Sequence, residues 1–322
     1  MSSSEDGPWS NVVPAFVDGR GEALLAARDL AAGARLLRVA PLAAVPYADA
    51  LDARCGGCFR ACDASRRCDG CGVARTCERC ARGFAREAHA RECHALRRLA
   101  QNDAGLSLAH TDLRLLLRLL ARRFAAPRLD ADADDANLDP AAEAAARDGD
   151  VIVDDYDAVL ELMSGLQGGD DGLLSDDAVA TLHEVAKQCK YLVDPQLRAS
   201  TDEYVALLGR LQLNGFELTA AEASAETAGK HAPIGVGVFP SAARFNHSCE
   251  ANAEQRFDKH GCIVVETRRA VPRGEELTIP YVDERLGWRE RNERLRKDFA
   301  FTCECAKCER EREAEGERKR GR

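Results

Sequence analysis

Asn246-His247-Ser248-Cys249 is followed in this sequence by two further distinctive segments, Gly274-Glu275-Glu276-Leu277-Thr278-Ile279-Pro280-Tyr281 and Cys303-x-Cys305-x-x-Cys308. Each segment alone has little specificity. A structural zinc ion takes four ligands, so the lone Cys249 needs the three later cysteines to complete a four-sulfur site. Such a site would hold the Asn-His segment against the segment that carries Tyr281.

The length and the cysteine content limit the possible classes of protein. With 322 residues the chain can bury a sizeable core, as one large or two modest domains. It has no run of about 18 apolar residues and no charged-then-apolar leader, so we expect no membrane span and no secretion. Fourteen cysteines, eight of them from Cys55 to Cys93, then indicate metal ligation in a reducing compartment, the cytoplasm or the nucleus.

The net charge of -9 is unevenly distributed. Arg54 to Arg98 carries 11 arginines against five acids, whereas Asp130 to Asp157 carries 11 acids against one base. Solvated surface is the simplest interpretation of both runs. A basic face alone is weak evidence for nucleic-acid binding, which we do not expect to be the main function.

Strands are predicted at both ends of the chain and helices between them. Short apolar runs alternate with Gly and Pro from Asn11 to Pro46, which is typical of strands and hairpins. Leucine spacing predicts an amphipathic helix within Leu106 to Phe124. A helical pattern resumes from about Ala178 to Leu213, with an interruption near Asp194-Pro195. Short strands return from Ile234.

Local composition predicts a turn, a loop and a tail in three other segments. A turn is predicted at Asp258-Lys259-His260-Gly261, before a strand that begins at Cys262. Residues 125–150 are rich in Ala and Asp and predict a disordered loop or a weak helix. The last residues, Glu309 to Arg322, have mixed charge and are predicted to be a solvated tail without a fold.

The cysteine-rich block predicts a zinc module. Seven of its eight cysteines and one histidine form four close pairs, with Cys62 left over, and two pairs supply the four ligands that one structural zinc ion takes. We predict cross-braced pairing on two ions, the first held by Cys55, Cys58, Cys77 and Cys80 and the second by Cys68, Cys71, His89 and Cys93. A closed zinc site performs no chemistry, so this module would organise structure or bind partners.

These segments together resemble the SET and MYND domain-containing protein-lysine methyltransferases. The resemblance covers about Arg20 to Phe124 and Ala178 to Cys308. It implies an α+β fold in which the SET fold of short β-sheets, a pseudoknot, carries an inserted MYND zinc finger, a helical insert and a zinc-bound post-SET segment. Cys249, Cys303, Cys305 and Cys308 would bind a third zinc ion. Many family members add a C-terminal helical-repeat domain, which this sequence is expected to lack.

The resemblance also implies the domain boundaries. The expected parts are the N-terminal SET segment (10–50), the MYND finger (55–93), a helical insert (94–230) with an acidic loop (126–157), the SET core (231–285), the post-SET segment (286–308) and a charged tail (309–322).

Site residues are carried over by position. Tyr281 matches the SET tyrosine whose hydroxyl faces the methyl-transfer site, and is the expected catalytic residue. The residues expected to bind S-adenosylmethionine are Arg20, Gly21, Glu22, Asn214, Asn246, His247, Phe299 and Phe301, of which the last two would also wall the substrate channel. Gly19-Arg20-Gly21, followed by Leu24-Leu25-Ala26, resembles the glycine-rich cofactor loop of SET domains. Its register is open: either the loop is two residues longer than usual, or Gly21-Glu22-Ala23 replaces Gly-x-Gly.

The implied function is S-adenosylmethionine-dependent methylation of a lysine in a histone or another protein. The alternative is a catalytically weak adaptor that binds partner peptides through the MYND finger. Departures from the family pattern at Ala23, Ala243 and Phe299 favour the adaptor a little. Intact Asn246, His247 and Tyr281 favour the enzyme.

Overall fold

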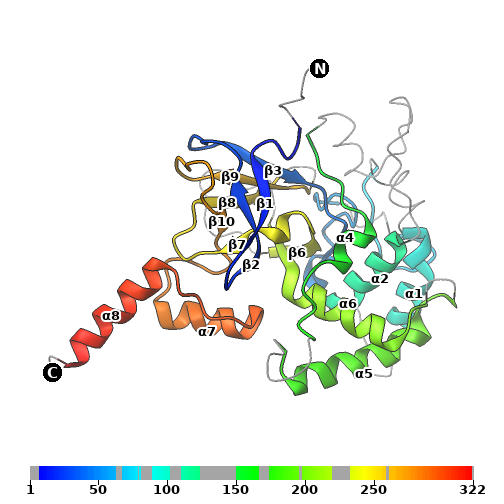
Figure 1. Cartoon of the computed structure of the whole chain (residues 1–322). Helices are drawn as coiled ribbons and strands as arrows, with labels where there is room; N and C mark the ends of the chain where they lie inside the picture. Colours follow the sequence, from blue (N-terminus) through cyan, green and yellow to red (C-terminus); the bar gives the residue numbers. More distant parts are fainter. Residues whose placement is uncertain are drawn as a thin grey trace. The chain divides into compact units, whose positions relative to one another are not determined.

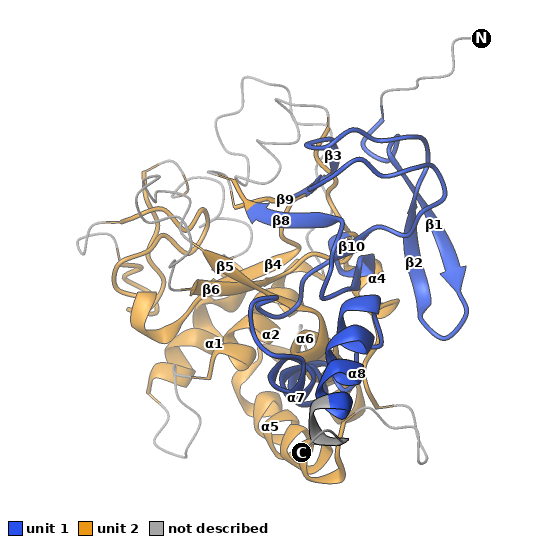
Figure 2. Cartoon of the chain, turned by 90° about the vertical axis from the view of Figure 1, so that its left-hand side faces the viewer, with its two compact units in different colours: residues 1–38, 242–256, 264–322 blue, residues 39–241, 257–263 orange. Residues whose placement is uncertain are grey.

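The computed structural model describes residues 7–62, 67–78, 80, 89–101, 110–123, 150–166, 174–195, 198–219, 233–258 and 261–320. Figure 1 shows the order of the elements and Figure 2 the two compact units into which the chain divides. Unit 1 comprises residues 1–38, 242–256 and 264–322, and unit 2 comprises residues 39–241 and 257–263. Residues 124–149, which include most of the predicted acidic loop (126–157), lie outside the described residues.

Unit 1 begins with an antiparallel hairpin of β1 (Val12–Val17) and β2 (Gly21–Ala26). In its turn, Gly19 and Gly21 have positive φ angles of 72° and 75°. Residues with a Cβ atom rarely adopt this left-handed backbone conformation. The strands predicted at this end of the chain are therefore confirmed, and the Gly-Arg-Gly segment forms their tight turn.

Short strands complete unit 1. It contains most of a three-stranded sheet in which β9 (Ile263–Thr267) lies between β3 (Arg35–Val39) and β8 (Ala253–Phe257). The 3-10 turn η5 (Ala242–Arg244) leads into β7 (Asn246–His247), which pairs in parallel with β10 (Thr278–Ile279). The parallel pair places the Asn-His segment beside the segment that leads to Tyr281.

Unit 1 ends with two helices, α7 (Trp288–Phe299) and α8 (Ala306–Arg320). The prediction that the charged tail does not fold is wrong, because α8 extends through most of it. Glu315 accepts hydrogen bonds from Trp288 and Arg289 of α7, and Glu311 pairs with the buried Arg291. These pairs tie a helix with little apolar surface to α7.

Unit 2 contains the sheet of order β4-β6-β5, formed by β4 (Ala43–Pro46), β6 (Pro233–Val238) and β5 (Gly215–Thr219). Both pairings are antiparallel. A Cβ atom at Gly235 would lie 2.5 Å from the carbonyl oxygen of Val45, so glycine is required for this close pairing. The 3-10 turn η1 (Ala48–Ala50) follows β4 and leads to the cysteine block.

Unit 2 also contains the helices α1 (Ala90–Ala100), α2 (Thr111–Arg122), α4 (Tyr156–Leu160), α5 (Asp176–Leu192) and α6 (Thr201–Asn214). Helix α2 contacts β4 and β6 of the sheet, and α6 contacts β5. Ser175 and Ser200 cap α5 and α6 by accepting hydrogen bonds from backbone N–H groups of the first turn. The predicted helices on both sides of Asp194-Pro195 are confirmed.

Helix α2 is more deeply buried than its amphipathic pattern predicts. Every residue from Leu113 to Ala121 is buried, including Arg114 and Arg118. The leucines pack against β4 and α6, and the two arginines bond to backbone carbonyls. Among the described residues, no helix combines the length and the apolar character that crossing a bilayer requires.

Candidate active site and metal centres

The cysteine block of unit 2 contains two four-ligand clusters with the predicted pairing. Cys55, Cys58, Cys77 and Cys80 form one cluster and Cys68, Cys71, His89 and Cys93 the other, with all ligand atoms of a cluster within 4.8 Å of one another. The sulfurs of Cys58 and Cys77 are 3.7 Å apart, as are those of Cys68 and Cys93. A tetrahedron of sulfurs about 2.3 Å from a zinc ion has edges of about 3.8 Å. Both clusters therefore fit zinc.

A buried carboxylate orients the histidine ligand. Nδ1 of His89 lies 3.2 Å from Oε1 of Glu92, and Nε2 faces the sulfur of Cys71 at 3.6 Å. Arg118 donates to both oxygens of Glu92 at 2.7 Å. Nδ1–H of His89 therefore donates a hydrogen bond to Glu92 and leaves Nε2 free for a metal ion, which is the usual arrangement of a metal-bound histidine. Sequence reasoning missed Glu92 and Arg118, since only their neighbours have metal-ligand spacing.

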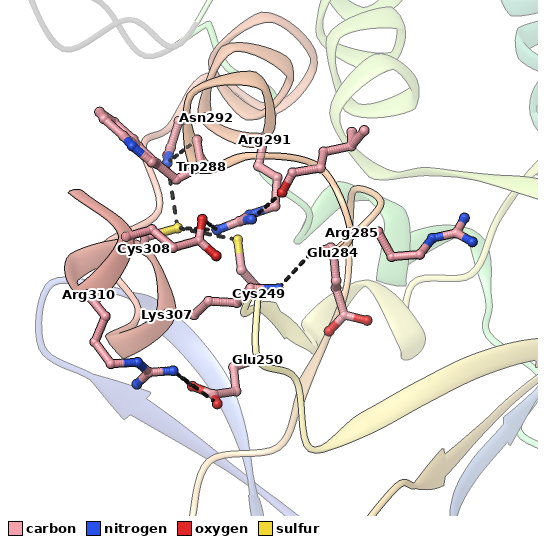
Figure 3. Close-up of polar contacts among 12 residues, drawn as sticks. Cys249, Glu250, Glu284, Arg285, Trp288, Arg291, Asn292, Lys307, Cys308 and Arg310 are labelled. Carbon is pink, nitrogen blue, oxygen red and sulfur yellow. Dashed lines mark hydrogen bonds and ion pairs between the residues drawn. The ribbon is translucent and has the colours of Figure 1, made fainter. Parts of the chain in front are cut away.

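The third predicted cluster, in unit 1, joins Cys249 to the trio Cys303, Cys305 and Cys308. The sulfurs of Cys249 and Cys308 are 3.5 Å apart. Figure 3 shows Arg291 and Asn292 of α7 beside the sulfur of Cys308, which accepts hydrogen bonds from both. These donors stabilise a thiolate, so the donor set fits zinc here as well.

Tyr281 lies directly after β10 and is held by two hydrogen bonds to the segment around β7. Its hydroxyl donates to the carbonyl oxygen of Phe245 at 2.6 Å, and its backbone N–H donates to Nδ1 of His247 at 3.0 Å. Burial raises the pKa of the Tyr281 phenol well above its usual value, and the carboxylate of Glu276 adds to the increase. The hydroxyl is therefore neutral at physiological pH.

Aromatic rings surround Tyr281. The ring of Phe299 lies 4.9 Å from that of Tyr281, and the ring of Phe301 lies 6.2 Å away, edge-on. Phe301 also lies 6.0 Å from the imidazole of His247. The structure thus brings together the predicted catalytic tyrosine, the predicted histidine and both predicted channel residues.

The other predicted cofactor residues of unit 1 form a polar network. The guanidinium of Arg20 donates to the carbonyl oxygen of His247 at 2.7 Å and pairs with Glu276 at 3.2 Å. The side-chain amide of Asn246 donates to Glu276 at 2.9 Å and to the backbone carbonyl of Glu22 at 3.0 Å. Glu276 therefore links the hairpin turn to the Asn-His segment, a role that its place in the Gly-Glu-Glu motif alone does not indicate.

Asn252 is a second residue that sequence reasoning missed. It is buried, and its side chain donates to Glu275 and to the backbone carbonyl of Glu276, while it accepts from the N–H of Thr278. These bonds hold the segment before β10 in register with β7.

Asn214, the remaining predicted cofactor residue, lies at the end of α6 in unit 2, where its amide donates to the carbonyls of Met163 and Arg210.

Comparison with known proteins agrees with this geometry. Residues 21–282 match the SET domain family. The chain is 28% identical to histone-lysine N-methyltransferase ASHR2 of Arabidopsis thaliana, 26% to N-lysine methyltransferase SMYD2 of Gallus gallus and 24% to histone-lysine N-methyltransferase SMYD3 of Mus musculus. These alignments cover 90% or 91% of this chain and 71%, 58% and 59% of the three relatives.

A solved structure of Rubisco LSMT bound to AdoMet is 14% identical, with a TM-score of 0.42 over 91% of this chain and 52% of that one. The family match begins at Gly21 and includes β2, the Asn-His strand and Tyr281, and it spans more than half of the sequence. The chain therefore belongs to the SET domain family.

Proposed function

We propose that this chain is an S-adenosylmethionine-dependent protein-lysine N-methyltransferase. The observation that carries the proposal is the fixed position of Tyr281 among aromatic rings, because its hydroxyl bonds to the carbonyl of Phe245 and its backbone N–H to the ring of His247. A neutral tyrosine beside apolar rings suits transfer of a methyl group to an uncharged amine. The names of the relatives, all of them lysine methyltransferases, support the same reaction.

The hairpin turn and the network next to it fit a cofactor. No described atom other than the adjacent residues lies within 4 Å of the place where a Cβ would stand on Gly19 or Gly21, so the backbone there is open to a ligand. Beside this turn, the side chains of Arg20 and Asn246 both bond to the carboxylate of Glu276. When bound, S-adenosylmethionine supplies a methyl group on a positively charged sulfur. Arg20, Gly21, Glu22, Asn246 and His247 would hold it.

The protein must present a neutral lysine amine. Deprotonating a lysine with a pKa near 10.4 costs about 4.6 kcal/mol at pH 7. The rings of Phe299 and Phe301 lower this cost by excluding water, because desolvation disfavours the ammonium form. The Tyr281 oxygen, with its proton directed at the Phe245 carbonyl, keeps lone pairs that can accept a hydrogen bond from the amine and so align it.

Calorimetric titration with S-adenosylmethionine tests the proposal. We expect binding by the wild-type protein and its loss in Asn246→Ala, since the variant removes both bonds of the Asn246 amide. Asn214→Ala tests the remaining predicted cofactor residue. Transfer of a labelled methyl group to lysine-containing peptides then tests the reaction. A folded, zinc-loaded protein that binds no cofactor would overturn the proposal.

One observation favours an adaptor as a second candidate. The backbone carbonyl of His247, one of the predicted cofactor residues, already accepts a 2.7 Å hydrogen bond from Arg20. An adaptor would use the zinc-binding finger to hold partner peptides and would have no need of the cofactor. Peptide capture by a protein that fails the calorimetric test would support this function.

A further inference from the structure

The guanidinium of Arg118, on α2, bonds to parts of the cysteine block that belong to different metal clusters. The side chain is only 7% exposed, and a charge buried this deeply needs hydrogen-bond partners. Nε and Nη2 donate to the two oxygens of Glu92 at 2.7 Å. Nη1 donates to the backbone carbonyls of Ala44 at 3.0 Å and Gly56 at 3.1 Å. Bonds to three residues therefore fix the plane of this one group.

Two of these three residues lead to zinc ligands. Gly56 lies between the first two cysteines of the first cluster, in the loop that carries them. Glu92 accepts a hydrogen bond from Nδ1 of His89, a ligand of the second cluster. The third residue, Ala44, belongs to β4, so the sheet holds the guanidinium in place. Arg118 is thus a rigid bridge from the loop of the first cluster to the outer-shell partner of the second.

Charge alone does not favour joint occupancy of the two clusters. A zinc ion held by four thiolates is a net anion, and so is one held by three thiolates and a neutral imidazole. Two such anions repel each other, and the carboxylate of Glu92 compensates the cation of Arg118. A favourable coupling between the clusters therefore has to come from the shared hydrogen bonds.

The bridge supplies such a coupling. Zinc in the first cluster orders the loop around Gly56, whose carbonyl then fixes Arg118 and, through Glu92, the ring of His89. The second cluster binds its ion more tightly because its histidine is already oriented. We propose that Arg118 couples the two zinc sites of the cysteine block, so that each ion raises the affinity for the other.

This coupling concerns metal loading and is independent of the proposed methyl transfer. By thermodynamic linkage it acts equally in both directions, and couplings between sites are typically about 5–150-fold in affinity. The cysteine block would then gain or lose both ions over a narrow range of free zinc concentration.

Protection of individual cysteines against alkylation tests the coupling. The full-length wild-type protein and Cys77→Ser, which disables the first cluster, are equilibrated in buffers of decreasing free zinc and treated briefly with N-ethylmaleimide. Peptide mass spectrometry then follows Cys68, Cys71 and Cys93 of the second cluster. In Cys77→Ser the free zinc concentration that half-protects them should rise about tenfold. Cys303, in the third cluster, is the internal reference and should not shift. Equal midpoints for the second cluster in the two proteins would overturn the proposal.

A pair of buried arginines on α2 shows whether Arg118 carries the coupling. In Arg118→Met the second-cluster midpoint should be the same with and without Cys77→Ser. Arg114→Met should keep the tenfold shift, because Arg114 is also buried, one turn earlier, but bonds to Pro46 and Thr111, which are not zinc ligands. A purely structural role of Arg118 would weaken the clusters and leave the shift intact, and that result would contradict the proposal.

Arg118→Lys decides the question if Arg118→Met does not fold. Lysine keeps the positive charge beside Glu92, but its single nitrogen lacks the planar fork that also reaches Gly56. The shift caused by Cys77→Ser should therefore fall well below tenfold in this variant. A full tenfold shift in a folded Arg118→Lys protein would overturn the assignment to the guanidinium.

Discussion

Nε2 of His247 lies 3.2 Å from the sulfur of Cys249. The other ring nitrogen, Nδ1, receives the backbone N–H of Tyr281 and must therefore be unprotonated. The ring proton is consequently on Nε2 and is donated to the sulfur. A single neutral imidazole thus connects the tyrosine of the proposed active site to a ligand of the third metal cluster.

This connection predicts that His247→Leu weakens both zinc binding at the third cluster and methyl transfer. The variant removes the donor to Cys249 and the acceptor for Tyr281 N–H. Loss of such an outer-shell partner typically lowers metal affinity by about 10–100-fold, so we expect zinc to leave the third cluster at lower chelator concentration, together with a reduced rate of methyl transfer. His94→Leu, at an exposed position of α1, is the control. Equal zinc retention by both variants would refute the connection.

Metal content tests the three clusters together. We expect three zinc ions per wild-type chain, one for each four-ligand cluster, and two in Cys305→Ser. Since Cys303 and Cys305 lie only a few residues after Phe299 and Phe301, losing the third ion should also weaken S-adenosylmethionine binding. Mass spectrometry under native conditions gives the count, and calorimetry gives the affinity. Unchanged cofactor affinity in a folded Cys305→Ser protein would rule out a role of the metal in ordering this segment.

Tyr281→Phe separates catalysis from folding and predicts a pH profile. The variant loses the bond to the Phe245 carbonyl but keeps the ring, so methyl transfer should fall by about 100-fold or more with little change in cofactor affinity. Because burial raises the pKa of Tyr281 above its usual value near 10, the phenol stays protonated below pH 10. The wild-type rate at low peptide concentration should then rise about tenfold per pH unit from pH 7 to 9, as the substrate lysine loses its proton. A decline in this range would contradict the assignment.

Much of the site was predictable because its residues occur in short motifs of fixed spacing. The pairing of the twelve metal ligands, and the position of Asn246 and His247 beside the segment leading to Tyr281, follow from such motifs. Glu276, Asn252 and Glu92 were missed because their roles depend on which distant backbone groups the fold brings to them. The helix α8 was missed since it has almost no apolar face, and its position depends on ion pairs with α7.

The buried pair of Glu92 and Arg118 predicts a large loss of stability. Glu92 is 1% exposed and Arg118 is 7% exposed, and they share two bonds of 2.7 Å. Glu92→Gln leaves the Arg118 cation buried without its counter-charge, a change that typically costs about 3–5 kcal/mol. Glu184→Gln removes an exposed pair with Lys187 and should cost less than about 1 kcal/mol. Urea unfolding of the zinc-loaded proteins measures both. A similar cost for the two variants would contradict this account of the pair.

The backbone of Ala300 offers a gain in stability. Ala300 ends α7 in the left-handed region, with φ 60° and ψ 27°, between the two phenylalanines that contact Tyr281. This conformation costs a residue with a Cβ roughly 1–2 kcal/mol, and glycine is the usual residue at such a helix end. Part of the gain is offset because glycine adds freedom to the unfolded chain. We therefore expect Ala300→Gly to raise the free energy of unfolding by roughly 0.5–1 kcal/mol. Ala314→Gly, inside α8, should instead lower it. If both variants lose stability equally, the left-handed backbone is not the source of strain.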